Sequence, residues 1–281
     1  MSARNRTVPV LMYHHISPVD GMITTSPVNF ELQLAWLARH GYRSMSSAEF
    51  AAHLGGQAAP PRSILITFDD GYLDNWVYAY PLLRKYGFSA MIFLITSLIG
   101  DGPARPHLGQ GGLPETPSHR DCGQRIQAGD ADSVMLRWNE VLAMRDSGVV
   151  EFHSHTHTHT RWDKSPRAAE KNQLMTRELM DSRATLEARL GSVSDHFCWP
   201  QGYFDADYVG IAHQAGFRYL YTTRAFGQNR PGSDPASIHR FAVRNTGGAS
   251  LGRRVRLAAN PVLGPLFNRW KRWARSQRRE S

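Results

Sequence analysis

The chain has 281 residues, of which 41% are hydrophobic and 20% charged, a composition typical of one large soluble domain. Its two cysteines, Cys122 and Cys198, show no CxxC spacing, which argues against a disulfide scaffold or a cysteine-built zinc site. Residues 253–281 hold nine of the 33 basic and one of the 24 acidic residues, so this end carries +8 of the net charge of +9. Because the rest of the chain is nearly neutral, nucleic-acid binding is not expected.

Short apolar runs alternate with amphipathic stretches, which predicts alternating strands and helices. In chain order we expect strands at 8–13, 64–68, 90–95, 149–153, 196–199 and 218–222, and helices at 29–40, 75–86, about 138–146, 166–190 and 206–215. This rhythm is typical of βαβ units and a parallel sheet. With seven or eight such strands, a barrel is favoured over an open sheet. There is no GxGxxG or GxxxxGK[ST] motif, which weakens any nucleotide-binding interpretation.

The chain is expected to divide into one domain over residues 1–250 and a tail over residues 251–281. Residues 99–134 interrupt the strand–helix rhythm and are rich in Gly, Pro and polar residues. We expect them to form a loop insert near the functional site.

In the tail, Leu266, Phe267, Trp270 and Trp273 fall at helical spacing with basic residues between them, which predicts a basic amphipathic helix. Such a helix is too short to span a bilayer but can lie in its interface, so a partner of the tail would be an anionic membrane surface. The alternative is a frayed, solvated terminus. The short apolar run at 8–13 does not resemble a signal peptide. The expected location is the cytoplasm, with the protein peripheral on the inner face of the cell membrane.

Polar side chains follow three of the predicted strands directly. His14-His15 follow the first strand, Asp69-Asp70 the strand at 64–68, and a histidine-rich run the strand at 149–153. In a parallel barrel these strand ends lie together, where functional residues gather. An Asp-Asp-Gly turn or a solvated histidine loop would explain each motif alone, but not their shared position.

The run Glu151 to His159 contains four histidines, and histidine is the commonest metal ligand. His155 and His159 are four residues apart, so in a helical turn they would share a face. Two imidazoles with one carboxylate and open positions form a set typical of catalytic metals.

These residues resemble the NodB-type polysaccharide deacetylases of carbohydrate esterase family 4. Residues 67–72 (TFDDGY) are similar to the first motif of the family and residues 154–159 (SHTHTH) to its second. Residues 9–15 (PVLMYHH) resemble a circularly permuted branch that includes poly-β-1,6-N-acetylglucosamine deacetylases, as do residues 197–202 (FCWPQG) and 238–241 (IHRF). The resemblance covers about residues 8–245. It implies a distorted (β/α)7-type barrel, with parallel strands and outer helices.

By position, the resemblance implies that Asp70, His155 and His159 bind a divalent metal. Asp69 would be the general base and His14 the general acid. The metal expected first is Zn²⁺, with Co²⁺, Ni²⁺ or Mn²⁺ as alternatives.

Other positions are assigned supporting roles or depart from the family pattern. The arginine of the third motif, which steadies the base, is replaced here by Cys198, and Arg240 is expected to substitute for it. An aromatic residue usually follows the proline of that motif, where this chain has Gln201. The residues expected to bind or support the substrate are Tyr72, Trp199, Pro200, Gln201 and Arg240.

Three further histidines are assigned lesser roles. His153 and His157 fall outside the ligand positions and are expected to support the site or to be solvated. His15 competes with His14 as the acid, but in an extended segment it points to the opposite side.

The function implied is metal-dependent hydrolytic N-deacetylation of an N-acetylated sugar, releasing acetate. The substrate would be a glycan or a lipid-linked glycan, such as a polyprenyl-phosphate sugar or a lipopolysaccharide precursor. The alternatives are an exopolysaccharide deacetylase acting on a polymer like poly-N-acetylglucosamine, and a non-catalytic carbohydrate- or lipid-binding module on the same fold.

Overall fold

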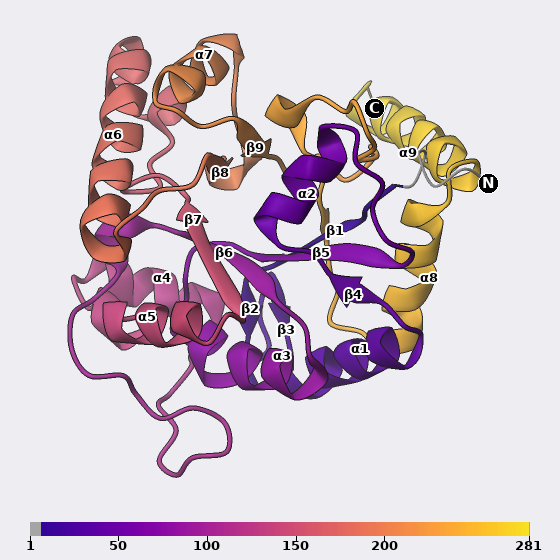
Figure 1. Ribbon diagram of the computed structural model, residues 1–281. Helices are drawn as coiled ribbons and strands as arrows, with labels where there is room; N and C mark the ends of the chain where they lie inside the picture. The colour runs from indigo at the N-terminus through magenta and orange to yellow at the C-terminus, as the bar shows by residue number, and fades with distance from the viewer. Residues whose placement is uncertain (1–6, 281) are drawn as a thin grey trace.

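A parallel sheet rolled into a distorted barrel forms the centre of the molecule (Figure 1). The structure, a computed structural model, describes residues 7–280 and the side chains of residues 7–274. The strands lie in the order β10 (Phe241–Ala242), β1 (Val10–Tyr13), β5 (Ser63–Phe68), β6 (Ala90–Leu94), β7 (Val150–Ser154), β8 (His196–Cys198) and β9 (Tyr219–Tyr221), and neighbours pair in parallel. A single parallel bridge between Tyr221 and Ile238 joins β9 to the segment before β10. The expected barrel of parallel strands is confirmed.

Helices surround this sheet (Figure 1). They are α1 (Pro27–Arg39), α2 (Ser47–Leu54), α3 (Tyr80–Tyr86), α4 (His119–Gln127), α5 (Trp138–Asp146), α6 (Lys171–Leu190), α7 (Ala206–Gln214), α8 (Gly248–Ala259) and α9 (Leu263–Glu280). Short helical turns occupy Asn75–Ala79, Thr96–Leu98, Ala131–Ser133, Trp162–Lys164, Ala168–Glu170, Pro200–Gly202 and Pro235–Ser237. Strand β4 (Arg43–Ser44) pairs with the start of β5, and β2 (His15–Ile16) pairs with β3 (Thr24–Thr25) in a separate small sheet. Among residues 7–280, no helix has both the length and the apolar composition needed to cross a membrane.

Alternation along the strands separates the barrel interior from the outer layer. In β5, Ile64, Ile66 and Phe68 pack in the large cluster that also contains residues of α1, α3 and α5, whereas Leu65 belongs to a second cluster with residues of β1, β6, β8 and β9. Side chains two apart on a strand share a face. The side chain at position 69, four residues after Leu65, therefore also points to the interior, at the carboxyl end of the barrel.

Two expected helices begin differently from the prediction. Over residues 75–86, a π-helical turn precedes α3, because Pro81 has no N–H to donate and disfavours a continuous α-helix. The helix expected at 166–190 starts at Lys171, after two 3-10 turns. Ser165 lies between these turns and accepts a hydrogen bond from Ala168, so it does not cap the helix.

The segment 99–134 is not the structureless loop that its composition predicts. It contains α4, whose Cys122 is buried. Arg105 anchors the segment: its guanidinium bonds both carboxylate oxygens of Glu140, each at 2.8 Å, and donates to the carbonyl oxygens of Asp132 and Met135. The Glu140 side chain is fully buried. This buried pair is a tertiary contact that no local sequence pattern reveals.

The boundary expected between residues 250 and 251 lies inside α8. This helix packs on α1, and Gly248 and Gly252 approach Trp36 so closely that a Cβ atom at either position would clash with its side chain. Leu251 and Val255 are buried. Helix α8 is therefore part of the barrel domain, and the tail that follows Asn260 forms α9.

Candidate active site

Titratable and ligand-type side chains meet at the carboxyl ends of β1, β5 and β7. His14 follows β1, Asp69 and Asp70 follow β5, and His155 follows β7. The Nε2 atom of His14 lies 3.7 Å from Oδ2 of Asp69, and Nε2 of His155 lies 3.3 Å from Oδ1 of Asp70. The structure thus brings together residues that are far apart in the sequence.

His14 and His15 point to different surroundings, as alternation along an extended segment predicts. His14 is part-exposed beside Asp69. The ring of His15 is buried, its Nδ1 lies 2.6 Å from a carboxylate oxygen of Asp74, and it stacks on Tyr72 at 3.8 Å. Of these two histidines, His14 is therefore the one that faces the carboxylates at the mouth of the barrel.

Asp70, His155 and His159 form a group able to hold one metal ion. Nε2 of His159 lies 3.7 Å from Oδ1 of Asp70, and the ligand atoms of all three residues lie within 4.8 Å of one another. Ligand atoms bound about 2.1 Å from a tetrahedral ion lie about 3.4 Å apart. The observed spacing is close to this value, so the three residues fit a divalent metal.

The surroundings of the two histidines fix which ring nitrogens face Asp70. His155 Nδ1 donates to the carbonyl oxygen of Cys198 at 2.8 Å, which directs Nε2 at Asp70. Burial acts to lower the pKa of His155, but Cys198 and Asp70 raise it above its usual value, so a metal bound here would replace a proton on Nε2. Burial and the neighbouring His155 lower the pKa of His159 to about 4. The ring of His159 is therefore neutral at physiological pH, the form that binds metals.

The two histidines do not share a helical turn, so that part of the prediction is wrong. Thr156 and His159 have positive φ angles of 69° and 62°. The backbone N–H of His159 donates to Oγ1 of Thr156, and Glu178 accepts from the N–H groups of His157 and Thr158. A tight turn held by Glu178 of α6 brings the rings together, with centroids 4.8 Å apart.

Arg240 lies against Asp69 inside the barrel. Its two terminal nitrogens lie 2.6 and 2.8 Å from the two carboxylate oxygens, and its Nε donates to the carbonyl oxygen of Thr222. Burial acts to raise the pKa of Asp69, but the guanidinium of Arg240 and His14 hold it below its usual value. Asp69 is therefore an ionised carboxylate in a fixed orientation.

A second group of ligand-type atoms, from Asp69, His155 and Cys198, lies nearby. It is less suited to a metal, because both oxygens of Asp69 are bonded to Arg240. Burial raises the pKa of the Cys198 thiol, which disfavours the thiolate that metals require.

The residues expected to support the substrate lie in different environments, some buried and some exposed. Trp199 is fully buried in the outer layer with residues of α6 and α7. It comes two residues after Phe197 of β8, so its side chain points to the same outer side of the sheet. It is a packing residue and cannot line a sugar pocket. Pro200 is also buried, whereas Gln201 is exposed in a left-handed conformation and accepts a hydrogen bond from Arg161.

The two remaining histidines of the run also differ. His153 is buried in the barrel, where its Nδ1 lies 2.5 Å from the Ser194 hydroxyl, so it is not solvated. His157 is part-exposed, and its Nδ1 lies 3.0 Å from Oγ1 of Thr96.

The sequence did not reveal a polar chain beside the site. His15 lies between Asp74 and His119, with its Nε2 3.1 Å from Nδ1 of His119, and the Tyr72 hydroxyl lies 3.4 Å from the same nitrogen. Asp74 is close to the Asp69-Asp70 motif in sequence and could have been suspected. His119, by contrast, stands in the insert with no motif around it.

Removing a member of the metal group should release the metal. We expect Asp70→Ala and His155→Ala to lower metal affinity by more than about 100-fold, because even losing an outer hydrogen-bond partner of a ligand costs 10–100-fold. His157→Ala, in the same turn but outside the group, is the matched control and should retain the metal. Metal content per chain after dialysis measures this, and full retention by Asp70→Ala would contradict the assignment.

Comparisons with known proteins point to one family. The family model described as polysaccharide deacetylase matches residues 56–220. The Bacillus subtilis (strain 168) protein YxkH is 38% identical over 113 residues, which are 40% of this chain and 39% of that protein. A poly-β-1,6-N-acetyl-D-glucosamine N-deacetylase of Staphylococcus aureus (strain N315) is 25% identical over 204 residues, which are 71% of this chain and 61% of that protein.

The match thus spans less than two thirds of the length of either relative. Among solved structures, IcaB from Ammonifex degensii superposes with a TM-score of 0.70 at 23% identity, over 91% of this chain and 98% of that chain. The Streptococcus pyogenes deacetylase PplD in complex with acetate gives a TM-score of 0.69 at 21% identity, over 89% and 98%. These structures share the fold. Because the family model covers more than half of the sequence, this chain belongs to the polysaccharide deacetylase family.

Proposed function

We propose that the protein hydrolyses the N-acetyl group of a sugar in a glycan, with acetate and a free amino sugar as products. One observation carries this proposal: an ionised carboxylate, Asp69, lies between His14 and a group that can hold a metal. A non-catalytic module would have no need of a base and a proton donor beside the same metal group.

The residues of this chain would move two protons. Asp69 takes a proton from the water whose oxygen bonds to the acetamide carbon. The C–N bond then breaks, and His14 delivers a proton to the leaving nitrogen, which would otherwise depart poorly. Burial lowers the pKa of His14, so its ring is neutral until it receives the proton that Asp69 has taken, and one water can bridge the 3.7 Å between His14 Nε2 and Asp69 Oδ2. Arg240 keeps the carboxylate oriented throughout.

A divalent metal held by Asp70, His155 and His159 would polarise the carbonyl and acidify water. Two imidazoles and a carboxylate suit Zn²⁺ best, with Co²⁺, Ni²⁺ and Mn²⁺ as substitutes. Reconstituting the metal-free protein with each ion and comparing acetate release would rank them.

An N-acetylglucosamine polymer is the substrate class we favour, supported by the name of the staphylococcal relative. A panel of polymeric and lipid-linked N-acetylated sugars, assayed for acetate, tests this choice. Release from polymers alone would support it, and release from lipid-linked sugars alone would favour the second candidate.

The second candidate is a lipid-linked sugar at the inner face of the cell membrane, which α9 favours. Its apolar stripe comprises Leu263, Leu266, Trp270 and Trp273, whose exposed fractions are 55, 60, 53 and 61%. The opposite side of the helix holds it to the barrel domain: the side-chain amide of Asn268 donates to the carbonyl oxygen of Gly227. Large exposed apolar patches mark interaction surfaces.

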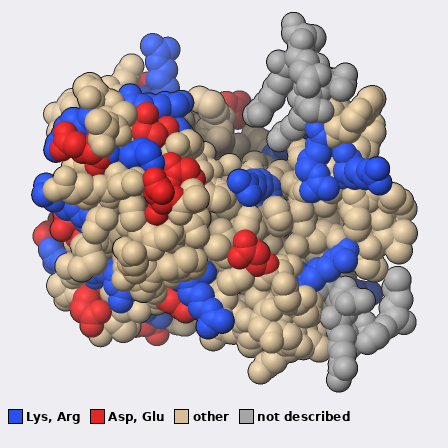
Figure 2. All heavy atoms as spheres, turned by 90° about the horizontal axis from the view of Figure 1, so that it is seen from above, with Lys and Arg blue, Asp and Glu red and all other residues tan. Residues whose placement is uncertain are grey.

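Basic side chains accompany this stripe. In Figure 2, blue side chains gather on the right, where α8 and α9 lie in Figure 1, while red and blue alternate on the left. A cleft of about 740 Å³ between α9 and the barrel is lined by Arg244, Arg254 and Lys271. None of the three forms an ion pair with an acidic side chain that the structure describes. The basic residues Arg275, Arg278 and Arg279 of the tail lie outside the described side chains.

We expect α9 to bind vesicles that contain anionic phospholipid, because its apolar stripe can enter the interface while each nearby basic residue contributes about 1 kcal/mol. Leu266→Glu with Trp270→Glu should weaken binding by more than about tenfold, since each apolar side chain contributes about 1.5–3 kcal/mol when buried. Vesicle sedimentation measures the effect. Met180→Glu, which charges an exposed apolar residue of α6, is the matched control.

A truncation gives an independent result if it ends after Asn260. Ending the chain after Gly252 would remove buried Val255 and unfold α8, so loss of binding there would be ambiguous. Unchanged vesicle binding by the chain ending at Asn260 would remove the membrane proposal.

A further inference from the structure

We propose that a pocket between residues 20–22 and α4 binds a sugar next to the one that is deacetylated. This inference rests on the proposed function and specifies its substrate as an oligosaccharide. The pocket has a volume of about 450 Å³, within the range of small-molecule sites. Its lining includes Asp20, Met22, His119, Arg120, Gln124 and Gln127.

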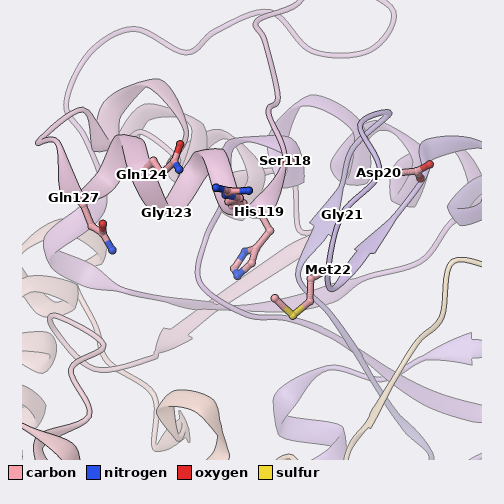
Figure 3. A pocket seen from close by; sticks show the side chains of 9 residues that line it. Asp20, Gly21, Met22, Ser118, His119, Gly123, Gln124 and Gln127 are labelled. Carbon is pink, nitrogen blue, oxygen red and sulfur yellow. The ribbon is translucent and has the colours of Figure 1, made fainter.

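Contacts of His119 connect this pocket to the catalytic residues. His119 bonds His15 and approaches the hydroxyl of Tyr72, and these residues directly follow His14 and the Asp69-Asp70-Gly71 motif. In Figure 3, His119 and Met22 extend into the same part of the pocket. His119 therefore belongs both to the pocket lining and to the group of side chains beside His14 and Asp70, which is the position that a sugar next to the deacetylated one would need.

Asp74 holds His15 in place, and His15 in turn contacts His119. Asp74 accepts hydrogen bonds from the backbone of Ile16 at 2.9 Å and from Asn75 at 2.8 Å, and its other oxygen lies 2.6 Å from His15 Nδ1. The carboxylate makes Nδ1 of His15 the donor, so Nε2 faces His119. This chain of contacts fixes where the His119 ring stands.

The polar side chains of the pocket are available to a ligand. Asp20, Arg120, Gln124 and Gln127 make no side-chain hydrogen bond or ion pair with any residue that the structure describes, and Gln124 and Gln127 both line the pocket from α4. Carboxylate, guanidinium and amide groups offer both donors and acceptors, as sugar hydroxyls require. Met22, 73% exposed, adds an apolar surface for a ring face.

Charge in the pocket favours a neutral saccharide. Asp20 and Arg120 are of opposite sign, so the lining carries no excess of either charge. The cleft beside α9 differs in charge, because Arg244, Arg254 and Lys271 line it without an acidic partner among the described side chains. A sugar without charge is the ligand whose chemistry matches the pocket.

Gly123 offers a direct way to fill the pocket without disturbing the fold. It lies on α4 in the pocket lining, and a Cβ atom there would meet nothing within 4 Å. Gly123→Trp should occupy the space of the neighbouring sugar, while Gly123→Ala leaves it open. Both replace glycine within a helix, which favours helix formation.

The experiment measures kcat/KM for N-acetylglucosamine and its oligomers from monomer to hexamer. The wild type and Gly123→Ala should gain about tenfold between monomer and dimer, as a few new hydrogen bonds would give, and Gly123→Trp should lose this gain mainly through KM. Gln124→Ala with Gln127→Ala should lose part of it, and Gln173→Ala on exposed α6 none. Equal length dependence in Gly123→Trp and Gly123→Ala, or no dependence in the wild type, would overturn the proposal.

Failure of the proposed function gives a different result. Acetate release from every oligomer at one rate would refute the pocket alone. Release from none by metal-loaded protein would refute the proposed function, and calorimetry of oligomer binding to Asp69→Asn, with and without Gly123→Trp, would then decide whether a sugar occupies the pocket.

Discussion

Asp69→Asn is expected to lower kcat/KM by about 10³-fold or more while the protein keeps its metal, since a positioned base contributes 10²–10⁴-fold. The substitution preserves the shape of the side chain but removes the charge that accepts a proton. Because Asp70, His155 and His159 are untouched, the metal group stays complete. Acetate release and metal content measured on the same preparation separate the two properties.

The control for this variant must allow for lost stability, because Arg240 loses its charged partner. Rates are therefore compared at a temperature at which circular dichroism shows both proteins fully folded. Wild-type turnover by folded, metal-loaded Asp69→Asn would mean that another group is the base.

Arg240→Met is expected to lower the free energy of unfolding by about 3–5 kcal/mol, because it leaves a carboxylate buried without its partner. Asp69 and Arg240 are both almost entirely buried, so water cannot replace the lost contact. Turnover should fall as well, since the carboxylate loses its orientation. Denaturant unfolding and acetate release measure the two effects.

A double variant distinguishes these roles of Arg240. Asp69→Asn with Arg240→Met removes both charges and should recover much of the lost stability, whereas turnover should stay low. Arg105→Met is a matched control, because it breaks another buried arginine–carboxylate pair away from the metal group. It should lose stability and keep most of its turnover on monomeric N-acetylglucosamine, which does not reach α4. Equal loss of turnover in Arg105→Met and Arg240→Met would mean that Arg240 acts through stability alone.

Much of the site followed from sequence because strand alternation is a local property. His14, Asp69 and His155 have the interior parity of their strands, and the parallel barrel brings their carboxyl ends together. The same rule, applied at β8, would have placed Trp199 on the outer face, beside Phe197. Family resemblance favoured Trp199 as a pocket residue, whereas the alternation of side chains along β8 predicts its outer position correctly.

Features that depend on distant contacts were harder to foresee. The turn that joins His155 to His159 is held by Glu178, which belongs to a helix beginning more than ten residues later. The insert folds around the buried Arg105–Glu140 pair, and α8 is fixed by its close approach to Trp36 on α1. Composition indicates that such segments are irregular or basic, but not what they pack against.

Metal-dependent chemistry at Asp69 is proposed to release acetate from an N-acetylated glycan. The most direct test is acetate release from an N-acetylglucosamine hexamer by one preparation in three states: metal-loaded, chelator-stripped and reloaded. We predict release in the first state, loss in the second and recovery in the third, with one free amine for each acetate. No release by the loaded protein, or equal release after stripping, would contradict the account.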